Sequence, residues 1–134
     1  MSKVLIVHTG WYRESVEKMN QFSIEVIEKK YTFDRVEAPG AIELAALAKN
    51  KILKNKYIGV IFNGIVIRGE TSHYDLISNE TFRSIGILAE NFYDIAVINN
   101  VICVENEDQL KERLEKNTKN NTKALMLLID EKSC

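Results

Sequence analysis

YIGVIFNGIVIRGETSHYD, residues 57–75, is the stretch that decides the fold. Its first part, residues 57–62, is short, apolar and partly β-branched, which predicts a buried strand. From Gly64 onward it combines a cation, carboxylates, hydroxyls and an imidazole, which indicates a loop that carries chemistry at the end of that strand. Gly69 is expected to let the backbone approach a ligand or take a positive φ.

Ser72 and Asp75 predict where the next helix begins. They have the spacing of a capping pair and precede an apolar periodicity that runs to about Asn91. Residues 69–73 would then lie at a helix N-terminus, where free N–H groups and the helix dipole favour a phosphate or a carboxylate. On these residues alone, a capped helix with Arg68 paired to a surface acid explains the pattern equally well.

The rest of the chain alternates strands and helices. Residues 3–7 predict a central strand covered on both faces, residues 32–38 an edge strand, and residues 95–104 a last strand interrupted by Asn99 and Asn100. This βαβαβαβα order predicts an α/β fold, a three-layer α/β/α sandwich around a four-stranded parallel sheet. Helices are predicted over about 16–27, 42–52, 75–91 and 106–116, with a polar loop over 116–123 and a short terminal helix over 124–129.

Composition predicts one soluble domain, residues 1–134, that buries about two-thirds of its unfolded surface. The net charge is -1 and the basic residues are scattered, so no nucleic-acid partner is expected. No apolar run reaches about 18 residues and no leader is recognised, so we expect a cytoplasmic protein without a membrane partner. Cys103 and Cys134 are then expected to be reduced thiols.

The sequence predicts neither a cofactor nor a metal. It has no dinucleotide-binding glycine pattern and no close cluster of metal ligands. A nucleophilic pair of Cys103 and His73 has no evident third group to orient it, and His8, His73 and Cys103 lack zinc-ligand spacing. Both sites are therefore minor alternatives.

The carboxyl ends of the predicted strands bring several polar segments together, because open α/β sheets bind ligands at that edge. Trp11 or Tyr12, after the first strand, is a candidate platform for a flat ring, although such aromatics more often pack a helix onto the sheet. Gly40 and Ala41 are small enough for a ligand to approach the backbone, and Glu43 can accept hydrogen bonds from a polar heterocycle.

Three motifs resemble signatures of the lumazine synthase family. Residues 64–75 (GIVIRGETSHYD) resemble its substrate loop, residues 39–43 (PGAIE) its second signature, and residues 104–109 (VENEDQ) with Arg113 a third. They follow the family's order and spacing over nearly the whole chain. The resemblance implies a flavodoxin-like fold and a transferase of riboflavin biosynthesis. Its reaction condenses 5-amino-6-(D-ribitylamino)uracil with 3,4-dihydroxy-2-butanone 4-phosphate to 6,7-dimethyl-8-ribityllumazine, phosphate and water, without a cofactor.

The resemblance also implies roles for individual residues. His73 would carry protons and Arg68 would support the loop. An aromatic stacks on the substrate ring, and the spacing favours Trp11 over Tyr12. The phosphate would contact Gly69, Glu70, Thr71 and Arg113, and the aminouracil would contact Trp11, Tyr12, Ala41, Ile42, Glu43, Ile65, Val66, Ile67 and Asn99.

The chain departs from the family pattern at three places. Tyr12 stands where a small amide is usual, residues 99–100 where Phe-Gly is common, and Asn121 where a phosphate-contacting lysine is often found. Lys119 or Lys123 would have to replace that lysine. These departures leave open a non-catalytic binding or assembly protein on the same scaffold, whereas the retained loop residues favour an enzyme.

The resemblance implies a homo-oligomer with active sites between neighbouring subunits of a five-membered ring. The arginine and the strand-four region would come from the next chain, and some members build twelve rings into a shell. Only Met1 and Ser2 precede the first strand, so we expect no added strand on a neighbour's sheet. The predicted loop over 116–123 lacks the glycine-rich turn that accompanies shells, so a homopentamer without a shell is expected.

Overall fold

The computed structural model describes residues 2–70 and 72–133. Strands and helices alternate throughout, and a short 3-10 turn follows each of β2 and β3. The elements are β1 (Lys3–Thr9), α1 (Arg13–Ile27), β2 (Thr32–Ala38), η1 (Ala41–Glu43), α2 (Leu44–Lys54), β3 (Gly59–Ile67), η2 (Arg68–Glu70), α3 (Tyr74–Asn91), β4 (Ala96–Val104) and α4 (Glu107–Lys132).

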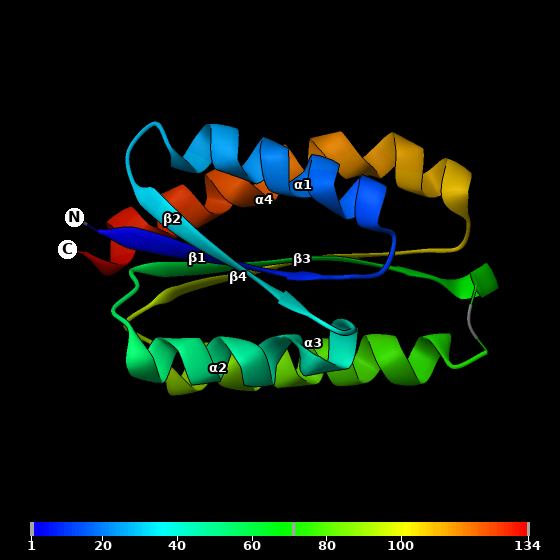
Figure 1. Cartoon of the computed structure of the whole chain (residues 1–134), viewed down its shortest axis with the longest axis horizontal. Coiled ribbons are helices and arrows are strands. Elements are labelled where there is room, and N and C mark those ends of the chain that lie inside the picture. Colours follow the sequence, from blue (N-terminus) through cyan, green and yellow to red (C-terminus); the bar gives the residue numbers. More distant parts are fainter. Residues whose placement is uncertain (1, 71, 134) are drawn as a thin grey trace.

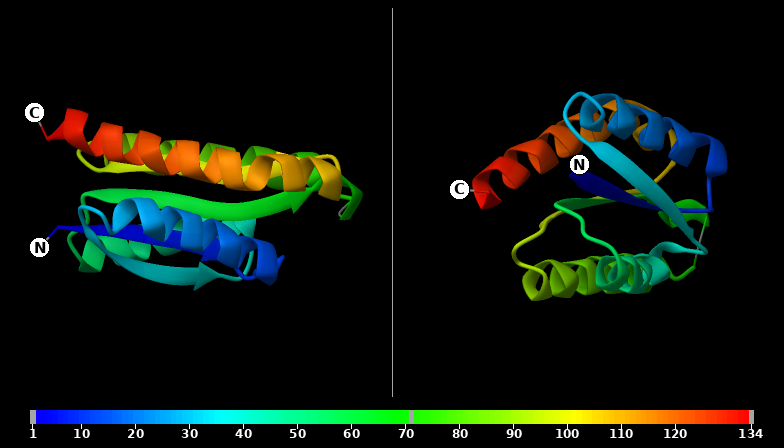
Figure 2. Two further views of the ribbon diagram at one scale, coloured as in Figure 1. Left: turned by 90° about the horizontal axis from the view of Figure 1, so that it is seen from above. Right: turned by 60° about the vertical axis from the view of Figure 1, so that its left-hand side comes forward.

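The four strands form one parallel sheet in the order β2-β1-β3-β4. Helices α1 and α4 cover one face and α2 and α3 cover the other, so the predicted three-layer sandwich is confirmed (Figure 1). The first strand is interior and β2 is an edge strand, as predicted. Both termini lie at the end where β1 begins, and the carboxyl ends of the strands point to the opposite end (Figure 2). No helix in the described ranges is long and apolar enough to cross a membrane.

Strand β3 is longer than predicted. The sequence suggested a strand that ended near Phe62 and a loop from Gly64, but the strand continues to Ile67. Its last three residues are buried between the helix layers and pair with Ile102, Cys103 and Val104 of β4. Apolar residues covered on both faces of a parallel sheet favour a strand, so the loop begins only at Arg68.

The predicted capping pair at the start of α3 is wrong. His73 occupies the N-cap position, and no side chain caps the helix there. The Asp75 carboxylate instead accepts a hydrogen bond from Arg68 at 3.2 Å. Gly69 does not use a left-handed conformation, since none of the described glycines has a positive φ.

Helix α4 is continuous, so the predicted loop over 116–123 and the separate terminal helix are wrong. Three polar residues of that segment, Thr118, Asn121 and Thr122, lie on the side of α4 that faces the core and form hydrogen bonds there. Asn121 donates to Asn100 at 2.7 Å, Asn100 donates to Thr118 at 3.0 Å, and the Thr122 and Ser23 hydroxyls lie 3.0 Å apart. Side chains that are typical of a loop therefore belong to the interior of the molecule.

Strand β4 is likewise uninterrupted, contrary to the prediction for residues 99–100. Asn100 is buried and donates to Asn63 at 2.8 Å, and Asn63 donates to Asn20 at 3.1 Å. Because each amide hydrogen-bonds to a neighbour, the strand keeps these residues in its interior. We refer to these interior polar residues as the amide network: Asn20, Ser23, Asn63, Asn100, Thr118, Asn121 and Thr122.

Candidate functional site

A pocket of about 430 Å³ lies at the carboxyl ends of β1 and β3, and we call it the strand-end pocket. Its walls come from the β1–α1 turn, the turn after β2, the end of β3 and the first turns of α3. Every residue predicted to contact an aminouracil lines this pocket except Asn99. The lining residues are Thr9, Trp11, Tyr12, Gly40, Ala41, Ile42, Glu43, Ile65, Val66, Ile67 and Ile77.

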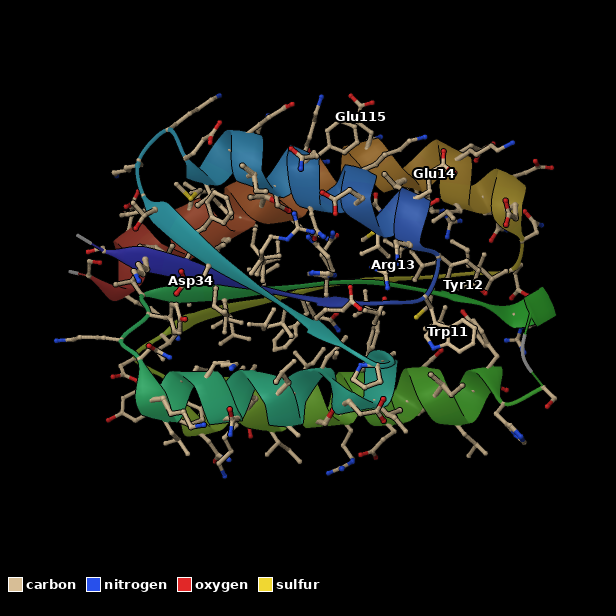
Figure 3. The ribbon with its side chains drawn as sticks, in the orientation of Figure 1. Trp11, Tyr12, Arg13, Glu14, Asp34 and Glu115 are labelled. Atoms are coloured by element: carbon tan, nitrogen blue, oxygen red, sulfur yellow. The ribbon has the colours of Figure 1, made fainter. Side chains whose placement is uncertain are left out.

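Figure 3 labels both candidate aromatics, Trp11 and Tyr12, in the turn between β1 and α1, and the two differ in solvent exposure. Tyr12 is partly buried and packs against the apolar cluster that includes Val16 and Ile65. Trp11 is 67% exposed, and its indole edge faces Gly40: a Cβ at that glycine would lie 3.9 Å from the indole nitrogen. Trp11 is therefore the more accessible of the two rings.

Thr9 and Ile77 line the pocket although the sequence did not single them out. Thr9 is the last residue of β1 and is only 2% exposed, and its hydroxyl oxygen has no hydrogen-bond partner in the described structure. Its position directly at a strand end could have identified it. Ile77 belongs to the apolar periodicity of α3, which in sequence indicates core packing, so no signal separated it from core residues.

A second hollow, of about 330 Å³, surrounds the loop after β3, and we call it the loop pocket. It is lined by Arg68, Ser72, His73, Tyr74, Asp75 and Leu76. Arg68 and Leu76 directly adjoin Ile67 and Ile77 of the strand-end pocket in sequence. The loop that carries His73 therefore borders the apolar ligand-sized pocket.

Arg68 fixes this loop through three contacts. Its Nε lies 2.7 Å from Glu105 Oε2, a terminal nitrogen lies 3.2 Å from Asp75 Oδ1, and its guanidinium carbon lies 4.4 Å from the Tyr74 ring centre. A planar guanidinium makes such contacts in a fixed geometry. Arg68 thus joins the end of β3 to the start of α3 and to the segment that leads into α4.

The residues predicted to hold phosphate are only partly together. Gly69 and Glu70 belong to η2, next to the loop pocket, and Thr71 lies outside the described residues. Arg113 is exposed on α4, which covers the opposite face of the sheet from α3 (Figure 1). Asn99 lies within β4, paired with Phe62, well before the carboxyl ends of the strands. Neither Arg113 nor Asn99 lines either pocket.

The lysines suggested as replacements lie elsewhere. Lys119 and Lys123 line a hollow of about 750 Å³ together with Glu25, Glu28 and Lys29. This hollow is larger than the strand-end pocket, but its mixed charges are typical of a solvated surface between two helices. The smaller pocket at the strand ends is therefore the candidate ligand site.

Cys103 and His8 have no arrangement that suits nucleophilic or metal chemistry. Burial raises the pKa of the Cys103 thiol, which disfavours the reactive thiolate. Burial likewise lowers the pKa of His8, whose Nδ1 lies 3.1 Å from the Thr9 carbonyl oxygen. Within residues 2–70 and 72–133, no group of three or more His, Cys, Asp or Glu side chains is placed to hold a metal ion.

Comparison with known proteins gives a consistent result. The sequence model of the 6,7-dimethyl-8-ribityllumazine synthase family matches residues 1–130. A synthase of that name from Bartonella tribocorum is 33% identical over 119 residues, which cover 87% of this chain and 78% of that protein. Another from Sphingopyxis alaskensis is 31% identical over 120 residues, 89% and 84% of the two chains. A flavone reductase structure has a TM-score of 0.43 at 13% identity, covering 92% of this chain and 63% of that one, which is too weak a likeness to bear on function.

Proposed function

Because the chain belongs to the 6,7-dimethyl-8-ribityllumazine synthase family, we propose that it catalyses the condensation that gives the family its name. The substrates are 5-amino-6-(D-ribitylamino)uracil and 3,4-dihydroxy-2-butanone 4-phosphate, and the products are the lumazine, phosphate and two molecules of water. The observation that carries the proposal is the strand-end pocket, whose walls include residues 40–43 and 65–67 from two of the three segments that resemble the family's signatures.

The aminouracil is proposed to occupy the strand-end pocket. Its flat ring stacks on Trp11, and residues 65–67 of β3 form an apolar wall. Glu43 accepts hydrogen bonds from the donor groups of the ligand, while the backbone of Ala41 and Ile42 meets its polar edge. An apolar pocket with a few convergent polar groups suits such a ligand.

His73 is proposed to move the protons of the reaction. Attack of the 5-amino nitrogen on the ketone forms an imine and releases water. A proton then leaves C3 of the butanone as phosphate leaves C4, and the resulting enol becomes a second carbonyl. The ribitylamino nitrogen attacks that carbonyl, and loss of the second water closes the ring. An imidazole can both accept and return a proton, which suits a group that acts as a base in one step and as an acid in another.

The departing phosphate is proposed to contact residues 69–71 and Arg113. A guanidinium can donate two hydrogen bonds to one phosphate group, which strengthens binding and stabilises the anion as it leaves. Arg113 lies on the opposite side of the sheet from the helix that follows His73, so a chain does not bring these two residues together in its own pockets. This separation supports a site completed by the Arg113 and the β4 region, including Asn99, of another copy.

We therefore propose a cytoplasmic homopentamer in which each site combines two neighbouring chains. A heterologous contact that closes into a ring provides the same His73–Arg113 pair at every interface. Residues 116–123 belong to the continuous helix α4. The predicted loop over these residues therefore cannot be used to predict whether larger assemblies form.

Mixing two impaired variants tests this proposal. His73→Ala and Arg113→Ala chains, unfolded and refolded together in equal amounts, are expected to form rings in which about a quarter of the sites are intact, since each site takes one residue from each neighbour. At a low concentration of the butanone phosphate, the mixture should form lumazine faster than the mean rate of the two variants refolded alone. A mixture no faster than that mean would contradict the shared site.

A further inference from the structure

The turn between β1 and α1 contains the one non-glycine residue with a positive φ in the described chain. Tyr12 has φ 53° and ψ 48°, the left-handed conformation, at the N-cap position of α1. A residue with a Cβ is disfavoured there, and a small amide tolerates this conformation better than an aromatic residue does. No side-chain hydrogen bond caps the helix at this position.

Arg13 and Glu37 provide a tether next to this residue. The two terminal nitrogens of Arg13 donate to the two carboxylate oxygens of Glu37 at 2.9 and 3.1 Å. The pair lies against Gly10: a Cβ on that glycine would come within 3.0 Å of Glu37 Oε2. The Gly10 N–H also donates to the Ala38 carbonyl at 3.1 Å. Both ends of the four-residue turn are thus fixed to β2.

Trp11 lies between these fixed points (Figure 3). Gly10 and Arg13 are each held to β2, Tyr12 packs into the apolar cluster beside α1, and the Trp11 indole lies next to Gly40 at the strand-end pocket. A change of φ at Tyr12 would rotate the peptide that follows Trp11 and move the indole relative to the opposite wall. The orientation of the indole therefore depends on the conformation of the turn.

We propose that the Arg13–Glu37 pair is a positioning device that holds the turn left-handed at Tyr12 and so sets the orientation of Trp11 in the strand-end pocket. Its effect on binding rests on the proposed function, since the aminouracil ring is taken to stack on Trp11. Its effect on the turn does not depend on any ligand. Exposed ion pairs are usually weak, but this one is bidentate and adjoins a strained residue.

The chain contains a matched control for this pair. Arg35 of β2 and Glu17 of α1 form a second bidentate pair between the same two elements, with contacts of 3.1 and 2.5 Å. In this pair the arginine is on β2 and the glutamate is on α1, the reverse of the Arg13–Glu37 pair. Glu17 lies one helical turn further along α1 from Trp11 than Arg13 does. Loss of Arg35 should therefore weaken the attachment of α1 to β2 without releasing the turn.

The experiment compares Arg13→Ala with Arg35→Ala. Trp11 is the only tryptophan of the chain, so its fluorescence reports on this turn alone. Without ligand, Arg13→Ala should change the emission maximum and increase acrylamide quenching, whereas Arg35→Ala should resemble the wild type. With substrates, Arg13→Ala should raise the KM for the aminouracil about tenfold, the ratio by which the left-handed conformation is disfavoured, and leave the KM for the butanone phosphate unchanged.

A rescue variant completes the test. Adding Tyr12→Asn to Arg13→Ala should restore the quenching of Trp11 toward the wild-type value, because asparagine adopts the left-handed conformation at less cost. Unchanged fluorescence in Arg13→Ala, or an equal change in Arg35→Ala, would overturn the positioning role. If the wild type does not bind the aminouracil, the proposed function fails, while the ligand-free fluorescence still decides whether Arg13 holds the turn.

Discussion

The guanidinium of Arg68 and the carboxylate of Glu105 lie 2.7 Å apart, and this contact ties the loop that carries His73 to the segment that precedes α4. Glu105 is held in turn, since its backbone N–H donates to the Gln109 side chain at 2.7 Å. Asn106 caps the helix by accepting from the Gln109 N–H at 2.9 Å. The loop is therefore anchored to a capped helix and not to a free segment of chain.

Glu105→Gln is accordingly expected to lower kcat about tenfold while shifting the unfolding temperature little. Small displacements of a reacting group are costly for the rate, whereas an exposed ion pair contributes about 1 kcal/mol or less to stability. Steady-state kinetics and thermal unfolding check this. The matched control is Glu80→Gln, which breaks the exposed Arg83–Glu80 pair within α3 and should leave kcat unchanged. Equal kcat values for the two variants would show that the contact between Arg68 and Glu105 does not position His73.

His73→Ala is expected to reduce kcat by about 10² to 10⁴-fold, which is the usual contribution of a general acid–base group. His73 is exposed, so the fold should be unaffected and the circular dichroism spectrum should match that of the wild type. The rate of lumazine formation at saturating substrates is the measurement. A variant that turns over at the wild-type rate would show that another group carries the protons.

Arg113→Ala should weaken binding of inorganic phosphate and of the butanone phosphate about tenfold or more, with little effect on the aminouracil, because it removes charge-assisted hydrogen bonds to one substrate only. Isothermal titration with each ligand checks the difference. Lys111→Ala, an exposed charge removal on the same helix, is the control. Parallel losses for both ligands would contradict a phosphate-specific role.

Asn100→Ala is expected to destabilise the fold by about 3 kcal/mol, because Asn63 and Asn121 each lose a buried hydrogen-bond partner and unsatisfied buried groups cost about 1–3 kcal/mol each. Urea unfolding gives the free energy. Asn120→Ala, on the exposed side of α4, should change it by less than about 0.5 kcal/mol. Similar losses for the two variants would mean that the amide network does not stabilise the contact between α4 and the sheet.

Acid should release the contact between Glu17 and Arg35. The Arg35 guanidinium lowers the pKa of Glu17 to about 2. A depressed carboxyl pKa stabilises the fold above the ordinary pKa of 4.5, and this contribution is lost as the pH falls toward 2. Because the pair is largely exposed, about 1 kcal/mol is expected. Glu17→Gln should lose less stability than the wild type between these two pH values, and an identical loss in urea unfolding would refute the assignment.

The sequence predicted the layers and the pocket because both depend on short-range patterns. Unbroken apolar strands specify a parallel sheet covered on both faces, and in such a sheet the segments after β1, β2 and β3 meet at one edge. That rule was enough to bring Trp11 and residues 41–43 together. It identified the wall of the pocket without any knowledge of tertiary contacts.

The errors arose where a polar side chain is satisfied by a residue distant in sequence. Thr118, Asn121 and Asn100 are typical of loops, and only their pairing across the core makes them part of a helix and a strand. The cap of α3 failed for a different reason, since Asp75 pairs with Arg68, a residue only seven positions earlier in the chain. Local propensity does not contain these tertiary partners.

The central claim is that this chain forms lumazine from two substrates, and it is tested most directly by incubating the wild-type protein with the aminouracil and the butanone phosphate. Absorbance of 6,7-dimethyl-8-ribityllumazine should appear at a rate proportional to protein concentration, with one phosphate released for each lumazine formed. If the aminouracil quenches the fluorescence of Trp11 but no lumazine forms above the uncatalysed rate, the chain is a binding protein and the claim is contradicted.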